Sequence, residues 1–182
     1  MHKVVIKKIN NQVKSFVAKR SAVTAVEFAL VGLPFTILMV GLLELGLAFG
    51  AASLLEGGTS DAARMIRTGQ VQDAGDPEVA FRDALCGHVD ALIPCGDIIY
   101  EVITLPNQDF TETPNFPPNY DVDGNLNGGG FDPGAENDVV LIRSFYRYPF
   151  VTLQLGSLMS PNGTNSMPMQ TTRVIRNEPY RF

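Results

Sequence analysis

An uninterrupted apolar run constrains this chain more than any other feature. From Phe28 to Leu43, sixteen consecutive residues carry no charge, and after Glu44 the apolar character resumes as far as Leu55. As one helix, residues 24–55 would be about 48 Å long at 1.5 Å per residue, which exceeds the roughly 30 Å hydrocarbon core of a bilayer. The sequence therefore predicts a helix that spans a membrane and extends beyond it.

The residues before this run indicate a retained anchor and its direction. A cleaved secretory signal is the alternative, but its apolar core is shorter, and this run lies behind a basic leader of about twenty residues. Six of the 14 basic residues lie in those twenty positions, which contain no acid. Because lysine-rich flanks stay in the cytoplasm, we expect the N-terminus in the cytoplasm and everything after residue 55 on the far side of the membrane.

The remainder of the chain is acidic. It holds all 19 acidic residues and only eight arginines, a formal balance of −11. Such a body cannot neutralise a run of phosphates, so we expect no nucleic-acid partner. Beyond the leader His88 is the only histidine, and no GxSxG, HExxH or phosphate-loop motif occurs. We therefore expect no enzyme, no catalytic residues and no cofactor.

Two carboxylates interrupt the apolar segment. Glu27 begins the uncharged run and Glu44 follows it, about 25 Å further along a helix axis. A charge at the bilayer centre costs about 2.5–3.5 kcal/mol, so an acid inside a membrane segment is a functional candidate by default. The alternative places both side chains near opposite interfaces, where water would solvate them.

The segment RSAVTAVEFALVGLP, around Glu27, resembles the N-terminal signature of TadE-like proteins, minor pilins or pseudopilins of tight-adherence (Tad or Flp) pilus systems. Later blocks, among them FRDALCGHVDALIPC and DVVLIRSFYRYPF, are similar to the family as well. The resemblance implies a structural or assembly subunit in the bacterial inner membrane, with its C-terminal domain in the periplasm or exposed on a pilus. Its implied partners are that membrane, other pilins, the pilus assembly machinery and a prepilin peptidase.

The same resemblance assigns roles to residues of the helix. A prepilin peptidase would cut between Ala22 and Val23, although the family usually has Gly where this chain has Ala22. The chain would then consist of a cytoplasmic leader (1–22), a transmembrane helix (23–56) and an extracytoplasmic domain (57–182). The Glu27 carboxylate would pair with the new Val23 amine of a neighbouring subunit, which would neutralise two charges that are costly alone. Two further candidates follow from the residues themselves and not from the resemblance. Glu44 is the second assembly candidate, because it is an acid in the apolar segment. Gly46 and Gly50 offer a small-residue surface for close helix packing.

Local signals predict an α+β body. Gly57-Gly58 should loosen or end the first helix, because each Gly costs up to about 1 kcal/mol there, and Gly69 is a plausible stop for a resumed helix. Asp76-Pro77-Glu78 should start a second helix, with an acceptor cap followed by a proline and an acid. Its expected core-facing residues are Phe81, Leu85, Val89 and Leu92.

Three strands are predicted after that helix, at residues 97–105, 138–148 and 171–176, because these runs are rich in β-branched and aromatic residues. The middle run alternates apolar residues on both faces, which indicates burial on both sides. The simplest arrangement is an antiparallel sheet packed against one or two helices.

Cys86 and Cys95 are the only cysteines. Outside the cytoplasm a short-range disulfide between them is the natural interpretation. Two buried free thiols are the alternative. A zinc site is disfavoured, because the two cysteines and His88 leave one of four ligands missing.

Between residues 106 and 137, half of the 32 residues are Pro, Gly or Asn, so no regular element is expected. This segment holds six acids and no basic residue, and it either lies on the domain or meets a partner. Its oxygen-bearing residues Asp121, Asp123, Asn125 and Asp132 imitate a calcium loop, but Leu126 stands where an EF-hand needs Gly. The alternative function is thus a permanently anchored binding protein that captures a ligand or calcium with this acidic segment.

Overall fold

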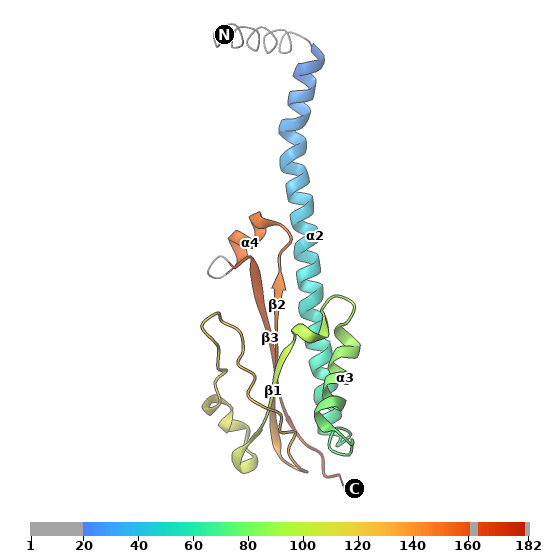
Figure 1. Cartoon of the computed structure of the whole chain (residues 1–182), viewed down its shortest axis with the longest axis vertical. Helices are drawn as coiled ribbons and strands as arrows, with labels where there is room; N and C mark the ends of the chain where they lie inside the picture. Colours follow the sequence, from blue (N-terminus) through green and yellow to red (C-terminus); the bar gives the residue numbers. More distant parts are fainter. Residues whose placement is uncertain (1–19, 161–163, 181–182) are drawn as a thin grey trace, which may run out of the picture. The chain divides into compact units, whose positions relative to one another are not determined.

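The computed structural model describes residues 20–160 and 164–180, so most of the predicted leader lies outside the described residues. The chain divides into two compact units, one ending at Leu43 and one beginning at Glu44. The regular elements in order are α2 (Arg20–Arg67), α3 (Pro77–Val89), η1 (Cys95–Asp97), β1 (Ile99–Leu105), η2 (Pro106–Gln108), η3 (Phe110–Asn115), β2 (Val139–Pro149), α4 (Leu153–Met159) and β3 (Ser166–Arg176) (Figure 1).

Helix α2 continues for 48 residues and passes through Gly57 and Gly58 without a break. The prediction that these glycines loosen or end the helix was wrong, and the reason lies in packing. A Cβ at Gly58 would stand only 2.8 Å from the Leu85 carbonyl oxygen of α3. The missing side chain thus lets α3 approach α2 closely. The helix ends at Arg67, and Gly69 follows at φ +82°, as expected of a C-terminal stop.

Helix α3 forms as its sequence predicts. Asp76 caps it by accepting a 3.2 Å hydrogen bond from the Val79 N–H, and Pro77 occupies the first turn. The predicted residues Phe81, Leu85 and Val89 are fully buried. Leu92 is 42% exposed, contrary to prediction, because the helix ends at Val89 and the helical spacing no longer applies.

The three strands form one antiparallel sheet in the order β1-β2-β3. The α+β prediction is confirmed, and β1 and β2 begin and end within two residues of the expected ranges. Strand β3 is longer than predicted, because it begins at Ser166 and pairs with β2 as far as Pro149. Pro168 is compatible with this pairing because β3 is an edge strand, where a missing N–H is tolerated.

Strand β2 is buried on both faces, as its sequence predicted. On one face Val140, Ile142 and Tyr146 join the main core with residues of α2 and α3. On the other face Val139 and Leu141 form a smaller cluster with Leu105, against which Phe116 and Val174 pack. The sheet is therefore the middle layer of the second unit, with the two helices on one side and the first part of the 106–137 segment on the other (Figure 1). Further along this segment, Phe131 pairs with Val102 at the edge of β1 and packs against the main core.

The 106–137 segment is mostly irregular, with two short exceptions. The 3-10 helices η2 and η3 occupy its first part, and isolated bridges join Val102 to Phe131 and Tyr120 to Leu126. The expectation of no regular element was therefore wrong for residues 106–115. Of the two alternatives for this segment, the structure has it lying on the domain.

Candidate functional site

The first unit presents an apolar helical surface. Every residue from Val23 to Leu43 other than the glycines is exposed, and most of these side chains are aliphatic or aromatic. Among the described residues α2 is the one helix long and apolar enough to cross a membrane. The 21 residues from Val23 to Leu43 measure about 31 Å as a helix, which equals the hydrocarbon thickness of a bilayer.

The predicted cleavage and assembly residues lie at the start of this surface. Ala22 and Val23 belong to the first turn of α2 that the structure describes. Glu27 is four residues beyond Val23, so the two lie on the same helix face. Within residues 20–160 and 164–180, the exposed Glu27 side chain has no ion-pair partner.

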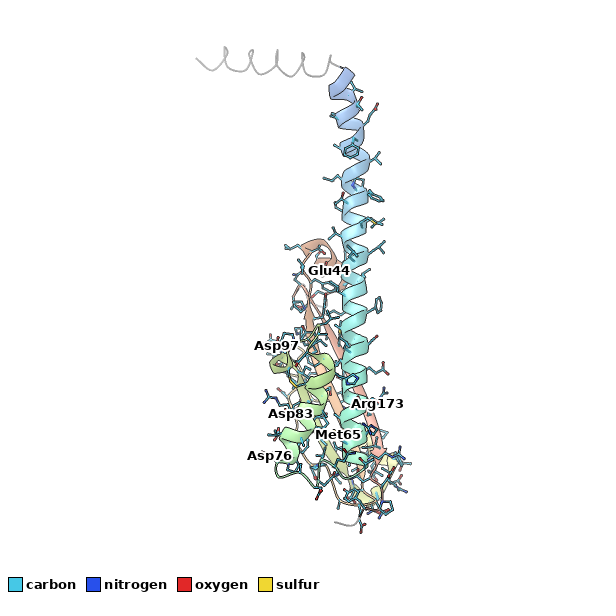
Figure 2. The ribbon with its side chains drawn as sticks, turned by 90° about the vertical axis from the view of Figure 1, so that its right-hand side faces the viewer. Glu44, Met65, Asp76, Asp83, Asp97 and Arg173 are labelled. Atoms are coloured by element: carbon cyan, nitrogen blue, oxygen red, sulfur yellow. A yellow bond between two sulfur atoms is a disulfide. The ribbon has the colours of Figure 1, made fainter. Side chains whose placement is uncertain are left out.

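Glu44 has a different environment from Glu27. It is 5% exposed and lies in the second unit, beside the segment that leads into α4 (Figure 2). Its carboxylate accepts hydrogen bonds from the backbone N–H groups of Val151 and Thr152, the latter at 3.1 and 3.2 Å from its two oxygens, and from the Thr152 hydroxyl. These bonds within the chain account for an acid in an apolar helix, and its predicted assembly role stays a prediction.

The two glycines of the predicted packing surface also differ. A Cβ at Gly50 would lie 3.3 Å from the Leu92 side chain, so this glycine faces a neighbour in its own chain. Gly46 is exposed and has open space around it. Close packing of a second helix against α2 remains a prediction. Of the two glycines, Gly46 is the one beside which a second helix would have room.

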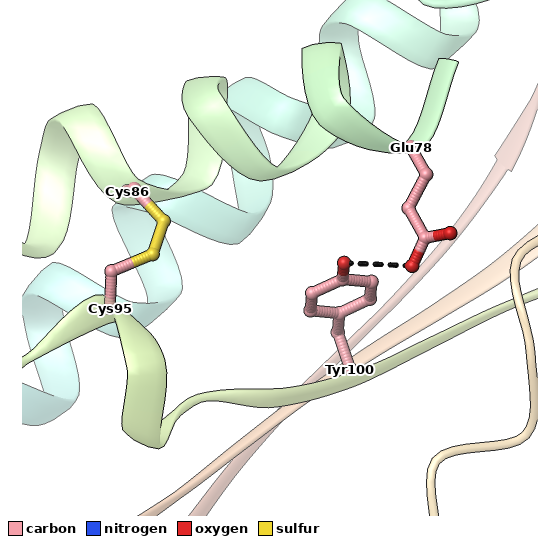
Figure 3. The surroundings of a disulfide bond; sticks show 4 residues. All are labelled: Glu78, Cys86, Cys95 and Tyr100. Carbon is pink, nitrogen blue, oxygen red and sulfur yellow. Dashed lines mark hydrogen bonds between the residues drawn. A yellow bond between two sulfur atoms is a disulfide. The ribbon is translucent and has the colours of Figure 1, made fainter. Parts of the chain in front are cut away.

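Two contacts fasten α3 to the sheet (Figure 3). Cys86 and Cys95 are joined in the expected disulfide, with their Cα atoms 5.4 Å apart, and this bond ties α3 to η1 just before β1. The Tyr100 hydroxyl on β1 donates a 3.0 Å hydrogen bond to Glu78 of α3. Burial, together with the hydrogen bond to Glu78 and its negative charge, raises the pKa of Tyr100 to about 12.

Arginines of the sheet hold the acidic segment in place. Arg143 is buried, pairs with Glu101 directly across the sheet, and donates to the Phe116 carbonyl oxygen. Arg147 donates to the Asp123 carbonyl oxygen at 2.8 Å, and Arg176 donates to that of Gln108 at 2.6 Å. Each of the three side chains therefore binds the backbone of the segment and places a positive charge next to it.

The calcium candidates are engaged in the same network. Asp121 accepts from the backbone N–H groups of Asp123 and Asn125 at 2.9 and 2.7 Å, and the bonds from Asn125 lead the causes that lower the Asp121 pKa. The Asn125 side-chain oxygen accepts from Arg147 at 2.8 Å. Asp132 caps Gly134 instead. Within the described ranges no group of three or more His, Cys, Asp or Glu residues could hold a metal ion.

Sequence reasoning missed the arginine contacts, although a signal was present. Arg143 and Arg147 are four residues apart in a strand that is otherwise buried, and a period of two places them on the same face. Two arginines on a buried face need partners, which an adjoining acidic segment can supply. The Glu44 contact had no comparable signal, because its partners lie 107 and 108 residues away in the sequence.

Comparison with known proteins agrees with the resemblance seen in the sequence. Residues 22–64 match the family model of TadE-like proteins, so the predicted resemblance to this family is confirmed over these residues of α2. This family is associated with Tad pili and is in general non-catalytic. No curated protein and no solved structure gives a significant match to the chain.

Proposed function

We propose, from the TadE-like match over residues 22–64, that this chain is a minor pilin or pseudopilin of a Tad-type pilus or a related secretion apparatus. It is a non-catalytic subunit of the bacterial inner membrane, with its N-terminus in the cytoplasm and its second unit in the periplasm. Its partners are other pilins, the assembly machinery and a prepilin peptidase. The exposed apolar surface of residues 23–43 is the observation that carries the proposal.

The membrane-spanning part of the helix is Val23–Leu43 in this account, shorter than the segment 23–56. Residues 44–56 belong to the second unit, and three of them, Ala48, Ala51 and Leu55, are buried in its main core. Side chains that pack inside a folded domain cannot also face lipid. The remaining 21 residues match the bilayer without tilt or thinning.

Glu27 gives this anchor its assembly function. Its carboxylate lies in the first turns of the lipid-facing stretch, where an unpaired charge is costly. Cleavage after Ala22 would create an α-amine at Val23, whose pKa of about 8 makes it a cation at neutral pH. A docked neighbour would supply that cation to Glu27. Pairing the two charges would offset the cost of removing each of them from water, which would favour correctly docked subunits.

The contacts of the acidic segment favour this function over an anchored calcium- or ligand-binding protein. Side-chain oxygens of Asp121 and Asn125 accept hydrogen bonds from within the chain, and the Arg147 guanidinium occupies the space beside them. A cation would have to displace a positive charge to bind there. The segment serves instead as the outer layer of the domain.

Processing at Ala22–Val23 tests the proposal. Intact-mass analysis of the protein extracted from membranes should show loss of residues 1–22 in cells with an active prepilin peptidase, and the full chain in cells that lack it. Ala22→Gly is the matched variant, because it restores the residue usual in the family and should be cut at least as fast. A chain that keeps Met1–Ala22 in peptidase-containing cells would sink the pilin assignment and leave a permanent anchor.

A further inference from the structure

The connection between β2 and β3 is unusual in composition. The connection itself is residues 150–165, and together with the adjoining ends of both strands it forms a stretch of 25 residues, from Tyr148 to Thr172, without Asp, Glu, Lys or Arg. This is the longest charge-free stretch of the chain, longer than the run at residues 28–43. Residues of a periplasmic domain that face only water have no reason to exclude charge over such a length. The composition indicates an apolar environment for at least part of this connection.

Exposed apolar side chains are concentrated at the start of this connection. Val151 is 87% exposed, Leu153 75% and Leu158 82%, and all three lie in or beside α4. Elsewhere in the second unit the large apolar side chains are mostly in the core. Single exposed leucines are ordinary on a protein surface, but a group on one short helix that itself carries no charge marks an interaction surface.

This group lies beside the first residue of the second unit. The N–H groups of Val151 and Thr152 donate to Glu44, so the connection is fastened to α2 at the first residue of the second unit. Leu43, the last residue of the lipid-facing stretch, directly precedes that glutamate. The opposite end of the unit lies further along the helix: Gly58, which α3 contacts, is about 21 Å beyond Glu44.

We propose that α4 and Val151 form a membrane-surface contact, in which the side chains of Val151, Leu153 and Leu158 enter the periplasmic leaflet of the bilayer that α2 spans. Surface elements of this kind bury their apolar side about 5–10 Å into the boundary between headgroups and acyl chains. The exposed side chains of Val151, Leu153 and Leu158 supply such an apolar side here. Glu44 is the positioning residue, because its carboxylate fixes the connection at the depth of the membrane surface. The inference rests on the proposed membrane span of Val23–Leu43.

Tryptophan fluorescence provides the test, because the chain contains no Trp and each variant reports on one position. Full-length L158W, L38W and V79W are reconstituted in vesicles of phosphatidylethanolamine and phosphatidylglycerol, with and without bromine on the acyl chains. Leu38 is in the middle of the lipid-facing stretch, and Val79 is a half-exposed apolar residue at the start of α3. Bromine quenches only a Trp that reaches the lipid.

The proposal predicts that L158W and L38W lose emission in brominated vesicles while V79W keeps its emission. Quenching of L38W without quenching of L158W overturns the inference and leaves the membrane span intact. Quenching of neither refutes the span itself, and with it the proposed function. A blue-shifted but unquenched L158W means that protein covers α4, which also overturns the inference.

Glu44→Gln in the L158W background tests the positioning role. Glutamine can accept fewer of the bonds from Val151 and Thr152 and adds an N–H₂ group that competes with these donors. The quenching of L158W should therefore fall, while that of L38W in a matched E44Q background should not change. Equal quenching of L158W with and without E44Q overturns the positioning role of Glu44.

Discussion

The structure predicts that one substitution, Gly→Ala, has different effects on stability at the two adjacent glycines of α2. A Cβ at Gly57 would meet the His88 ring carbon at 3.6 Å, an ordinary van der Waals contact. A Cβ at Gly58 would stand 2.8 Å from the Leu85 carbonyl oxygen and 3.1 Å from the Val89 side chain. Because the first of these is backbone, α3 itself would have to move to admit the methyl group.

The magnitudes follow from two terms. Gly→Ala in a helix interior stabilises by up to about 1 kcal/mol at either position. Overpacking a well-filled contact costs about 1–3 kcal/mol and applies only to Gly58. Gly57→Ala should therefore raise the free energy of unfolding by up to about 1 kcal/mol, whereas Gly58→Ala should leave it unchanged or lower it by up to about 2 kcal/mol. The helix term cancels in the difference between the two variants, which isolates the contact with α3.

The assay is urea unfolding of the full chain in detergent micelles with its disulfide intact, followed by circular dichroism. A variant that moves the midpoint at an unchanged slope has changed stability alone. If Gly58→Ala stabilises the protein as much as Gly57→Ala, then α3 does not approach α2 as closely as described, and the explanation for the unbroken helix fails.

Three further predictions concern the second unit. Reduction of the Cys86–Cys95 bond should lower the free energy of unfolding by about 2–3 kcal/mol, measured by urea unfolding with and without reductant. Arg143→Met leaves the Glu101 carboxylate buried without its partner and should cost about 3–5 kcal/mol, most of which a second change, Glu101→Leu, should restore; a double variant as unstable as the single one would contradict this. The Tyr100 pKa of about 12 lies above its ordinary value of 10.0. The contribution of the neutral Tyr100 phenol to the free energy of unfolding is therefore fully present below pH 10 and is lost as the pH rises towards 12. Tyr100→Phe should remove this loss of stability between pH 10 and 12.

Sequence reasoning succeeded where the signals are local. The Asp76 cap and the proline after it determine where α3 starts, independently of the rest of the fold. The middle strand alternates apolar residues on both faces, and its burial on both faces follows directly from that pattern. The apolar run of α2 likewise predicts a membrane helix by length and composition alone.

It failed where distant partners decide. The glycine pair of α2 predicts a break in the helix, and only the close approach of α3 explains why the helix continues through it. Strand β3 extends to Ser166 because β2 offers pairing groups along its whole length, which the Pro and Met residues of that stretch do not indicate. The sequence predicts that Glu44 is an acid inside the membrane, whereas its hydrogen-bond partners are Val151 and Thr152, more than 100 residues later in the chain.

In the proposed function Glu27 acts in pilus assembly and not in anchoring. The measurement is the number of pili on cells that produce Glu27→Gln at the normal membrane level, with Glu44→Gln as the comparison. Glu27→Gln keeps the shape of the side chain and removes its charge. We therefore expect normal membrane insertion and an unchanged unfolding curve of the second unit, together with a loss of pili. Glu44→Gln should instead destabilise the second unit by about 1.5–3 kcal/mol, because it weakens hydrogen bonds to a charged acceptor. Undiminished piliation with Glu27→Gln would contradict the account and reduce α2 to a hydrophobic anchor.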